Sequence, residues 1–176
     1  MKKVLVISKD PNLYKQGNYY KELIDALISD KNLCIEINDF NKVIDFKKFD
    51  IIILSHSFID IITDYISITR KFPFRYFPLL NIFRKFMLKS NYRIKELTNF
   101  NGKKIFFSKN DYKLIDLKII ITNLLNVNLF ITHTKKAKIL FHEKINCELK
   151  WIPFTVSKIN FRTIKKKKLI LDLEQI

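Results

Sequence analysis

The sequence has very few glycines and cysteines. Its only glycines among 176 residues, Gly17 and Gly102, lie too far apart to form the G-x-G-x-x-G fingerprint of dinucleotide-binding proteins or a P-loop. Nucleotide binding through a glycine-rich loop is therefore excluded within this chain. The two cysteines, Cys34 and Cys147, are also distant, and neither has a second cysteine or a histidine at the spacing of metal ligands. We expect buried free thiols, and the sequence predicts no metal site and no cofactor.

Long hydrophobic runs are also missing. No apolar run reaches the eighteen or so residues that a membrane span requires. The first residues, MKKVLVIS, resemble a signal peptide only in their two lysines, because Asp10 and Pro11 end the apolar run too early. Hydrophobic residues still make up 48% of the chain, enough for the core of one domain of this length. We expect a cytoplasmic protein that associates peripherally with the inner face of the cytoplasmic membrane.

Acidic residues are absent between Asp64 and Glu96, although the chain as a whole carries a formal charge of +16. A chain rich in Lys, Ile and Asn can reflect an AT-rich genome, but that explanation spreads lysine evenly. Here the basic residues cluster, at Arg70, Lys71, Arg75, Arg84, Lys85, Lys89, Arg93 and Lys95. Aromatic residues lie between them, at Phe72, Phe74, Tyr76, Phe77, Phe83, Phe86 and Tyr92. This stretch predicts an anionic partner.

Pro78 can occupy the first turn of a helix in this basic stretch. The apolar positions of that helix share one stripe: Leu79, Ile82, Phe83, Phe86, Met87 and Ile94. Arg84, Lys85 and Lys89 lie at the edges of the stripe or opposite it. The pattern predicts an interfacial helix on anionic lipid, with Phe83 and Phe86 entering the membrane surface. A core-packing helix with a solvated basic face has the same pattern and remains an equal alternative.

Six short apolar or alternating runs predict strands, at residues 3–8, 33–37, 50–55, 104–108, 128–132 and 148–152. Helical spacing lies between them at 19–29, 111–125 and 135–144, with a weak signal at 42–49. This alternation predicts an α/β domain, a single Rossmann-like, doubly wound parallel sheet with helices on both faces, with strand order 3-2-1-4-5-6. We expect this domain to span residues 1–161, with a basic aromatic helical insertion at 59–101 and a basic tail at 162–176.

Polar residues follow several predicted strands. Asn110 and Asp111 follow the fourth strand, where either can cap the next helix. His56 follows the third strand and His133 the fifth, so both imidazoles should emerge at the same edge of a parallel sheet. There a histidine can act as a general base or bind a phosphate or a sugar hydroxyl, although each histidine can also be purely structural.

Four segments together resemble a known family: DIIILSHSF at 50–58, KKIFFSKNDYKLIDLKI at 103–119, NLFITHTKKAKILF at 128–141 and WIPFTVSKINF at 151–161. They look like the amino-terminal half of a GT-B glycosyltransferase of the large retaining family that builds bacterial polysaccharides. The resemblance covers residues 2–161. Its most recognisable pieces are NDYK at 110–113 and WIPF at 151–154.

The resemblance implies the acceptor-side domain of a glycosyltransferase of polysaccharide or glycolipid synthesis. It implies acceptor contacts from Gly17, Asn18, His56, Asn110, Asp111, Tyr112 and Lys113, with His56 and His133 as catalytic candidates. Pro153 and Phe154 would position a second domain that binds the nucleotide sugar. Positions that match that donor domain are missing from these 176 residues, so we expect no activity of this chain alone, whether it is a truncated product or half of a split enzyme. The alternative is a non-catalytic basic module that binds anionic lipid or, as the less favoured partner, nucleic acid.

Overall fold

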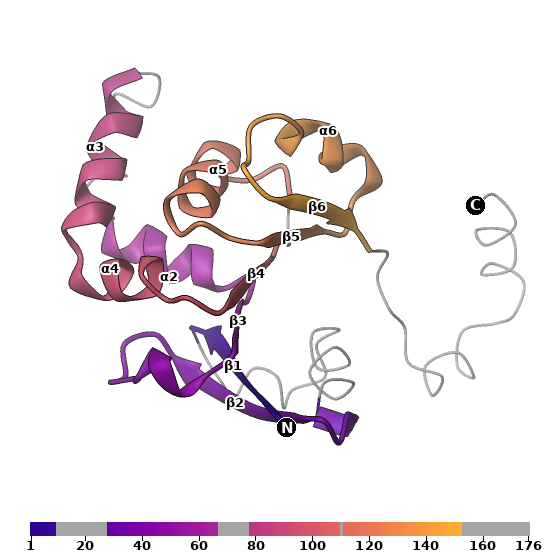
Figure 1. Cartoon of the computed structure of the whole chain (residues 1–176). Helices are drawn as coiled ribbons and strands as arrows, with labels where there is room; N and C mark the ends of the chain where they lie inside the picture. The colour runs from indigo at the N-terminus through magenta and orange to yellow at the C-terminus, as the bar shows by residue number, and fades with distance from the viewer. Residues whose placement is uncertain (10–27, 67–77, 110, 153–176) are drawn as a thin grey trace, which may run out of the picture.

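The computed structural model describes residues 1–9, 28–66, 78–109 and 111–152 (Figure 1). They form an α/β domain around a six-stranded, all-parallel sheet flanked by helices, which confirms the predicted Rossmann-like class. The strands are β1 (Lys2–Ser8), β2 (Leu33–Asp39), β3 (Ile51–Leu54), β4 (Lys103–Phe107), β5 (Leu129–Thr132) and β6 (Glu148–Trp151). All six predicted strands are thus present, with ends shifted by at most two residues.

The strand order is β2-β1-β3-β4-β5-β6, so the predicted order 3-2-1-4-5-6 is wrong. Strand β1 pairs with both β2 and β3. Burial explains the difference, because Ile52, Ile53 and Leu54 of β3 are all buried and need neighbours on both sides. No residue of β2 is fully buried. Its first residues alternate between half-buried and exposed positions, with Cys34 and Glu36 exposed, which suits an edge strand. The direction in which successive strands are added to the sheet therefore reverses between β1 and β3.

The described helices pack on one face of the sheet, as Figure 1 shows. Three of them, α2 (Phe58–Tyr65), α3 (Pro78–Ser90) and α4 (Tyr92–Thr98), form the connection from β3 to β4 that was expected as an insertion. Helix α5 (Ile115–Leu124) follows β4, and the short elements η4 (Lys135–Ala137) and α6 (Lys138–Phe141) follow β5. The connection from β2 to β3 holds one 3-10 turn, η2 (Phe46–Lys48). The helix predicted at 19–29 lies outside the described residues except for its last two positions.

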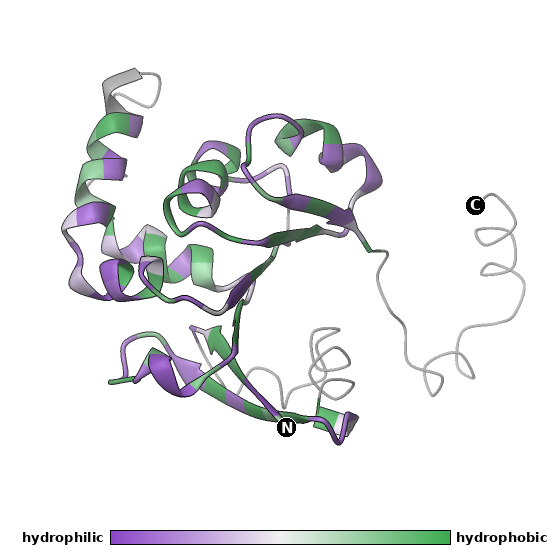
Figure 2. Cartoon of the chain, in the orientation of Figure 1, coloured by the Kyte–Doolittle hydropathy of each residue, from purple (hydrophilic) through white to green (hydrophobic). Residues whose placement is uncertain are grey.

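The sheet divides the apolar side chains into two clusters. On the helix-covered face the strands contribute residues at alternating positions, including Leu5, Ile7, Leu54, Phe106 and Phe130. The residues between them form the second cluster on the opposite face: Val4, Val6, Ile53, Phe107 and Ile131. In Figure 2 much of the length of the central strands is coloured as hydrophobic. Because all strands are parallel, their carboxyl ends share one edge of the sheet, the carboxyl edge, and their starts share the amino edge.

Candidate functional site at the carboxyl edge

Small hydroxyl side chains stand where four of the strands reach the carboxyl edge. Ser8 ends β1, Ser55 follows β3, Ser108 follows β4 and Thr132 ends β5. Each is buried, with at most 3% of its surface exposed. Ser and Thr can close an apolar strand while their hydroxyl groups bond to neighbouring loops, since one hydroxyl both donates and accepts. The carboxyl edge therefore has a polar layer directly above the apolar core.

The first part of this layer lies where the strand order reverses, between β1 and β3. The Ser57 hydroxyl lies 3.1 Å from the Ser8 hydroxyl and 2.9 Å from that of Ser55. The Lys9 amide also donates to the Ser57 oxygen, at 3.0 Å. In open α/β sheets, ligands bind at such a reversal of strand order. These bonds hold the two strand ends together at the position where a ligand is expected.

Asp111 joins the loops that follow β4 and β5. Its carboxylate accepts hydrogen bonds from the Ser108 hydroxyl at 2.6 Å, the Thr132 hydroxyl at 2.7 Å and the Thr134 amide at 3.3 Å. The side chain is 1% exposed. The predicted capping role of Asp111 is wrong, because α5 begins at Ile115 after Leu114, and no side chain caps it. The hydroxyl donors from β4 and β5 draw the carboxylate inward, away from the helix.

Lys118 of α5 lies beneath the same loops and is 3% exposed. Its ammonium group donates to the backbone oxygen of Lys109 at 2.9 Å. Burial lowers the pKa of Lys118 to about 8, although the nearby carboxylates of Asp111 and Asp60 oppose the shift. The loop after β4 is thus held by a buried cation in addition to the Asp111 carboxylate.

His133 is fixed between strands. Its Nδ1 lies 3.0 Å from the backbone oxygen of Ile152, and its ring packs edge-on against Phe107 with the ring centroids 4.6 Å apart. The Trp151 indole donates to the His133 backbone oxygen at 3.1 Å. Burial lowers the pKa of His133, and the bond to Ile152 only partly offsets this effect. A neutral ring that donates from Nδ1 to a backbone oxygen fits a structural role.

His56 is partly exposed and lies within electrostatic range of His133, so the two histidines do converge at the carboxyl edge. Burial lowers the pKa of His56 to about 4, and the positive charges of Lys109, His133 and Lys118 add to the shift. At neutral pH the imidazole is uncharged and a weak base. An uncharged imidazole can exchange hydrogen bonds with a hydroxyl group, whereas a general base with a pKa so far below 7 is poorly matched to proton abstraction.

The remaining predicted site residues have different positions. Tyr112 is 58% exposed beside the Asp111 loop, and Lys113 is also exposed. Gly17, Asn18, Asn110, Pro153 and Phe154 lie outside the described residues. The residues that sequence reasoning missed are the row of hydroxyls and Lys118. The hydroxyls had a visible signal, because Ser or Thr follows the apolar run of each of these strands. Lys118 had none, since a lysine in a helix is normally solvated.

In the described part of the chain, neither a metal site nor a thiol lies beside the hydroxyls of the carboxyl edge, because Cys34 lies at the start of β2 and Cys147 directly before β6. In the described ranges, no three His, Cys, Asp or Glu side chains are grouped so that they could hold a metal ion. Both cysteines are free, but the expectation of burial is wrong for Cys34, which is exposed on the edge strand β2. Burial raises the pKa of the half-buried Cys147 thiol to about 11, which makes it unreactive.

Comparisons with protein-family models, curated proteins and solved structures found no match to this chain. No described helix is long and apolar enough to cross a membrane.

Proposed function

We propose that this chain is the acceptor-side half of a GT-B glycosyltransferase of cell-surface polysaccharide or glycolipid synthesis, and that it binds the acceptor at the carboxyl edge. The observation that carries the proposal is the polar layer of hydroxyls around Asp111, with the uncharged His56 beside it. The parallel sheet and its reversal between β1 and β3 support a ligand at this edge.

The direct contacts to an acceptor would come from the solvent-facing residues. The buried hydroxyls bond to one another and to Asp111, so they hold the loops in place. His56 and Tyr112 reach solvent. A neutral imidazole and a phenol can exchange hydrogen bonds with sugar hydroxyls, and the exposed tyrosine ring can pack against a sugar face. This chemistry suits a hydroxyl-rich acceptor.

Binding of a glycolipid mimic tests the acceptor part. Octyl glucoside below its micelle concentration should shift the NMR signals of His56 and Tyr112. Tyr112→Ala should weaken this binding, whereas Tyr92→Ala should not, because Tyr92 is equally exposed, at 62%, but lies on α4. Unchanged His56 and Tyr112 signals, or equal loss in both variants, would contradict acceptor binding at this edge.

The donor part of the enzyme would come from outside these 176 residues. Calorimetric titration with UDP-glucose and UDP-N-acetylglucosamine should show no binding by the chain alone and binding after addition of the product of a neighbouring gene that encodes a donor domain. Turnover of a nucleotide sugar by this chain in isolation would contradict the assignment as an acceptor half.

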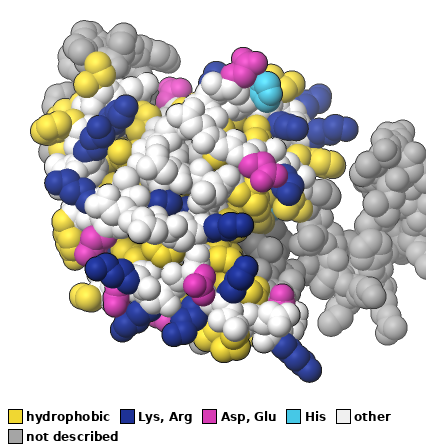
Figure 3. Space-filling model, viewed as in Figure 1, with side chains coloured by type: hydrophobic (Ala, Val, Ile, Leu, Met, Phe, Trp, Pro, Cys, Tyr) yellow, Lys and Arg dark blue, Asp and Glu magenta, His cyan; other side chains and the backbone are white. Residues whose placement is uncertain are grey.

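A second candidate function, binding to anionic lipid, is favoured by α3. Its Ile82, Phe83 and Phe86 are 65%, 44% and 68% exposed, while Lys85 and Lys89 are exposed beside them. Figure 3 shows hydrophobic and basic side chains together along the edge of the molecule that α3 forms. Apolar residues flanked by lysines suit a peripheral position on an anionic membrane surface.

The apolar stripe and the basic residues predicted for this helix differ from the structure in two respects. Helix α3 ends at Ser90, so Ile94 lies on α4, where it is 2% exposed, and Met87 packs against the core beside the buried Leu88. Arg84 is half-buried and donates to Asn81 at 3.3 Å, which leaves Lys85 and Lys89 as the solvent-facing basic residues of this group. The apolar residues are thus divided between the core and the surface, a division that periodicity alone does not reveal.

Co-sedimentation with vesicles tests this candidate. The chain should bind phosphatidylglycerol vesicles and not phosphatidylcholine vesicles, and should bind single-stranded oligonucleotides weakly at physiological salt. Replacing Lys85 and Lys89 with Gln should release it, because each basic residue near the surface contributes about 1 kcal/mol. The matched control replaces the exposed Lys136 and Lys138 with Gln and should have little effect. If wild-type protein ignores anionic vesicles, the membrane role is excluded.

A further inference from the structure

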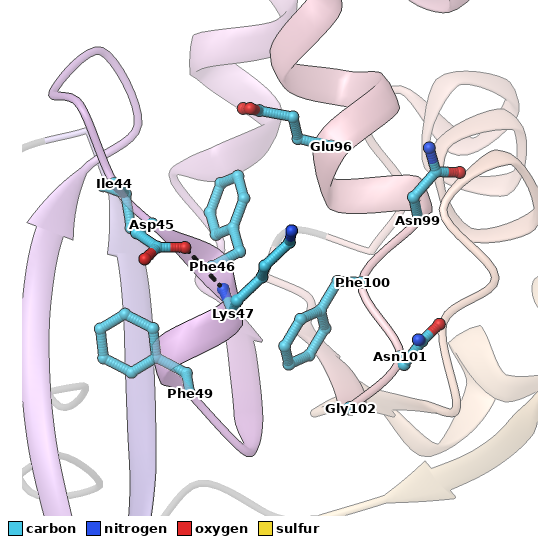
Figure 4. Close-up of a pocket in the computed structure, with 10 residues that line it drawn as sticks. All are labelled: Ile44, Asp45, Phe46, Lys47, Phe49, Glu96, Asn99, Phe100, Asn101 and Gly102. Atoms are coloured by element: carbon cyan, nitrogen blue, oxygen red, sulfur yellow. Dashed lines mark hydrogen bonds between the residues drawn. The ribbon is translucent and has the colours of Figure 1, made fainter.

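A cavity of about 580 Å³ lies at the amino edge, at the opposite end of the strands from the proposed acceptor site (Figure 4). One wall is formed by η2 and the residues that lead into β3. The other wall is formed by the end of α4 and the turn that joins it to β4. Three phenylalanine rings, Phe46, Phe49 and Phe100, form much of its lining. Its volume is in the range of small-molecule sites, and its open shape gives access from solvent.

The aromatic lining is held rigidly by the surrounding structure. Phe100 packs against Gly102 so closely that a Cβ atom at Gly102 would lie 2.3 Å from its ring. The buried ammonium of Lys104 donates to the backbone oxygens of Phe100, Thr98 and Leu97 at 3.1, 3.0 and 3.3 Å, which fixes the end of α4. The cavity is therefore preformed, and a ligand would not have to order it.

Phe46, on the η2 wall of the cavity, is also held in place by its neighbours. It is 5% exposed, and the Arg93 guanidinium lies 5.9 Å from its ring centroid. The Asp45 carboxylate accepts from the Lys47 amide at 3.2 Å and so caps η2, the turn that carries Phe46. Figure 4 shows the rings of Phe49 and Phe100 on either side of the Lys47 side chain.

The polar residues around the opening differ in charge from the rest of the chain. Asp45 and Glu96 are negative and Lys47 is positive, and the Lys48 ammonium lies 4.0 Å from the Asp45 carboxylate, so the opening is close to neutral on a chain of +16. Within the described part of the chain, the side chains of Glu96 and Asn101 make no hydrogen bond or ion pair, so both can meet a ligand. The opening thus lacks the excess of basic residues that would attract phosphate, nucleic acid or anionic lipid.

We propose that this cavity binds a neutral sugar ring, as a second carbohydrate site separate from the carboxyl edge. The C–H face of a pyranose is weakly positive and apolar, and it complements the negative face of a phenylalanine ring. The carboxylate of Glu96 accepts hydrogen bonds from sugar hydroxyls, and the Asn101 amide both donates and accepts. The proposal rests on the cavity alone and stands whether or not the acceptor site at the carboxyl edge is correct.

Amide NMR titration of the full chain tests this site. Glucose, galactose, mannose and N-acetylglucosamine would each be added up to about 50 mM, since one sugar ring on an open site binds weakly. At least one should shift the signals of residues 45–49 and 96–102 in a saturable manner. Butylamine and inorganic phosphate serve as cationic and anionic probes. If no sugar shifts these signals, or if only butylamine or only phosphate does, the proposal is overturned.

Variants then identify the contacts. Asn101→Ala should weaken the sugar about fivefold, the usual effect of losing one hydrogen bond, and leave the melting temperature unchanged because Asn101 is exposed. Asn41→Ala, at another exposed asparagine outside this cavity, is the matched control and should have no effect. Phe49→Tyr should retain binding and Phe49→Leu should lose it, because only the former keeps the aromatic face. Equal binding by the tyrosine and leucine variants would contradict stacking on this ring.

Discussion

The two edges of the sheet differ in how far their polar side chains are buried. At the carboxyl edge the polar groups are buried and bond to one another, as Asp111 does with Ser108 and Thr132. At the amino edge aromatic rings line an open cavity, and polar side chains such as Glu96 and Asn101 face solvent. The carboxyl edge therefore uses its polar groups mainly to hold loops in place. The amino edge uses one buried group, Lys104, in this way and leaves other polar side chains available.

The difference indicates what each edge contributes to binding. At the carboxyl edge the buried groups act as positioning residues, and only a few side chains, such as His56 and Tyr112, can meet a ligand. At the amino edge the fixed elements are the rings and the backbone, and the polar side chains can contact a ligand directly. Substitution of buried polar groups should therefore reduce stability at the first edge, whereas substitution of exposed ones at the second should alter binding alone.

The largest effect is expected from Asp111→Ala. The change removes the acceptor for the Ser108 and Thr132 hydroxyls and the Thr134 amide, and it takes a compensating charge away from the buried Lys118. Breaking such a buried charged network costs about 3–5 kcal/mol. Urea denaturation would measure the change in the free energy of unfolding. A loss near 1 kcal/mol would mean that Asp111 acts only as an ordinary local contact.

The next largest effect is a pH dependence of the free energy of unfolding, caused by the titration of Lys118. Its pKa is about 8 in the folded chain, against 10.5 for an unburied lysine. Between these pH values the unfolded chain binds more protons than the folded chain, so stability rises with pH across this window. Relative to Lys118→Met, the unfolding free energy of the wild type should increase by about 3 kcal/mol from pH 8 to pH 10.5. A constant difference between the two proteins would show that Lys118 keeps its ordinary pKa.

At the amino edge the corresponding test is Gly102→Ala. The added methyl group would lie 2.3 Å from the Phe100 ring and 2.4 Å from the backbone oxygen of Asp50, so the turn before β4 must move. Overpacking of this kind costs about 1–3 kcal/mol. Thermal unfolding would measure it, and sugar binding should fall as the Phe100 ring is displaced. Wild-type stability in this variant would show that the turn adapts freely and that the cavity is not rigid.

Sequence reasoning located all six strands because each is an apolar or alternating run bounded by polar residues. It did not give their order, which depends on how many neighbours each strand requires: β3, IIIL, is buried throughout, whereas β2, LCIEIND, exposes alternate residues. That difference was visible in the two sequences and favours β2 at the edge.

The site was predicted less well than the fold. His56 and His133 were expected at one edge because they follow parallel strands, and the structure brings them there. The role of Asp111 was not predictable from its own neighbourhood, because one of its hydrogen-bond donors, Thr132, lies 21 residues further along the chain. The burial of Lys118 and the division of the α3 stripe also depend on tertiary packing, for which periodicity carries no information.

The effect that bears most directly on the ligand is the titration of His56. With a pKa of about 4, its imidazole should stay neutral down to about pH 4, and the stability it contributes should be present above pH 6.5 and lost as the pH falls toward 4. NMR titration of the ring protons would measure this. Lys109→Gln should raise the pKa, because Lys109 is the strongest charge acting on the ring.

The same titration separates the possible ligands of the carboxyl edge. A bound neutral glycoside leaves the local charge unchanged, so octyl glucoside should shift the His56 signal without raising its pKa. A bound phosphate adds negative charge beside the ring and should raise the pKa toward the ordinary value. If inorganic phosphate raises it and the glycoside has no effect, the edge is an anion site, and the neutral His56 no longer argues for a hydroxyl-rich acceptor.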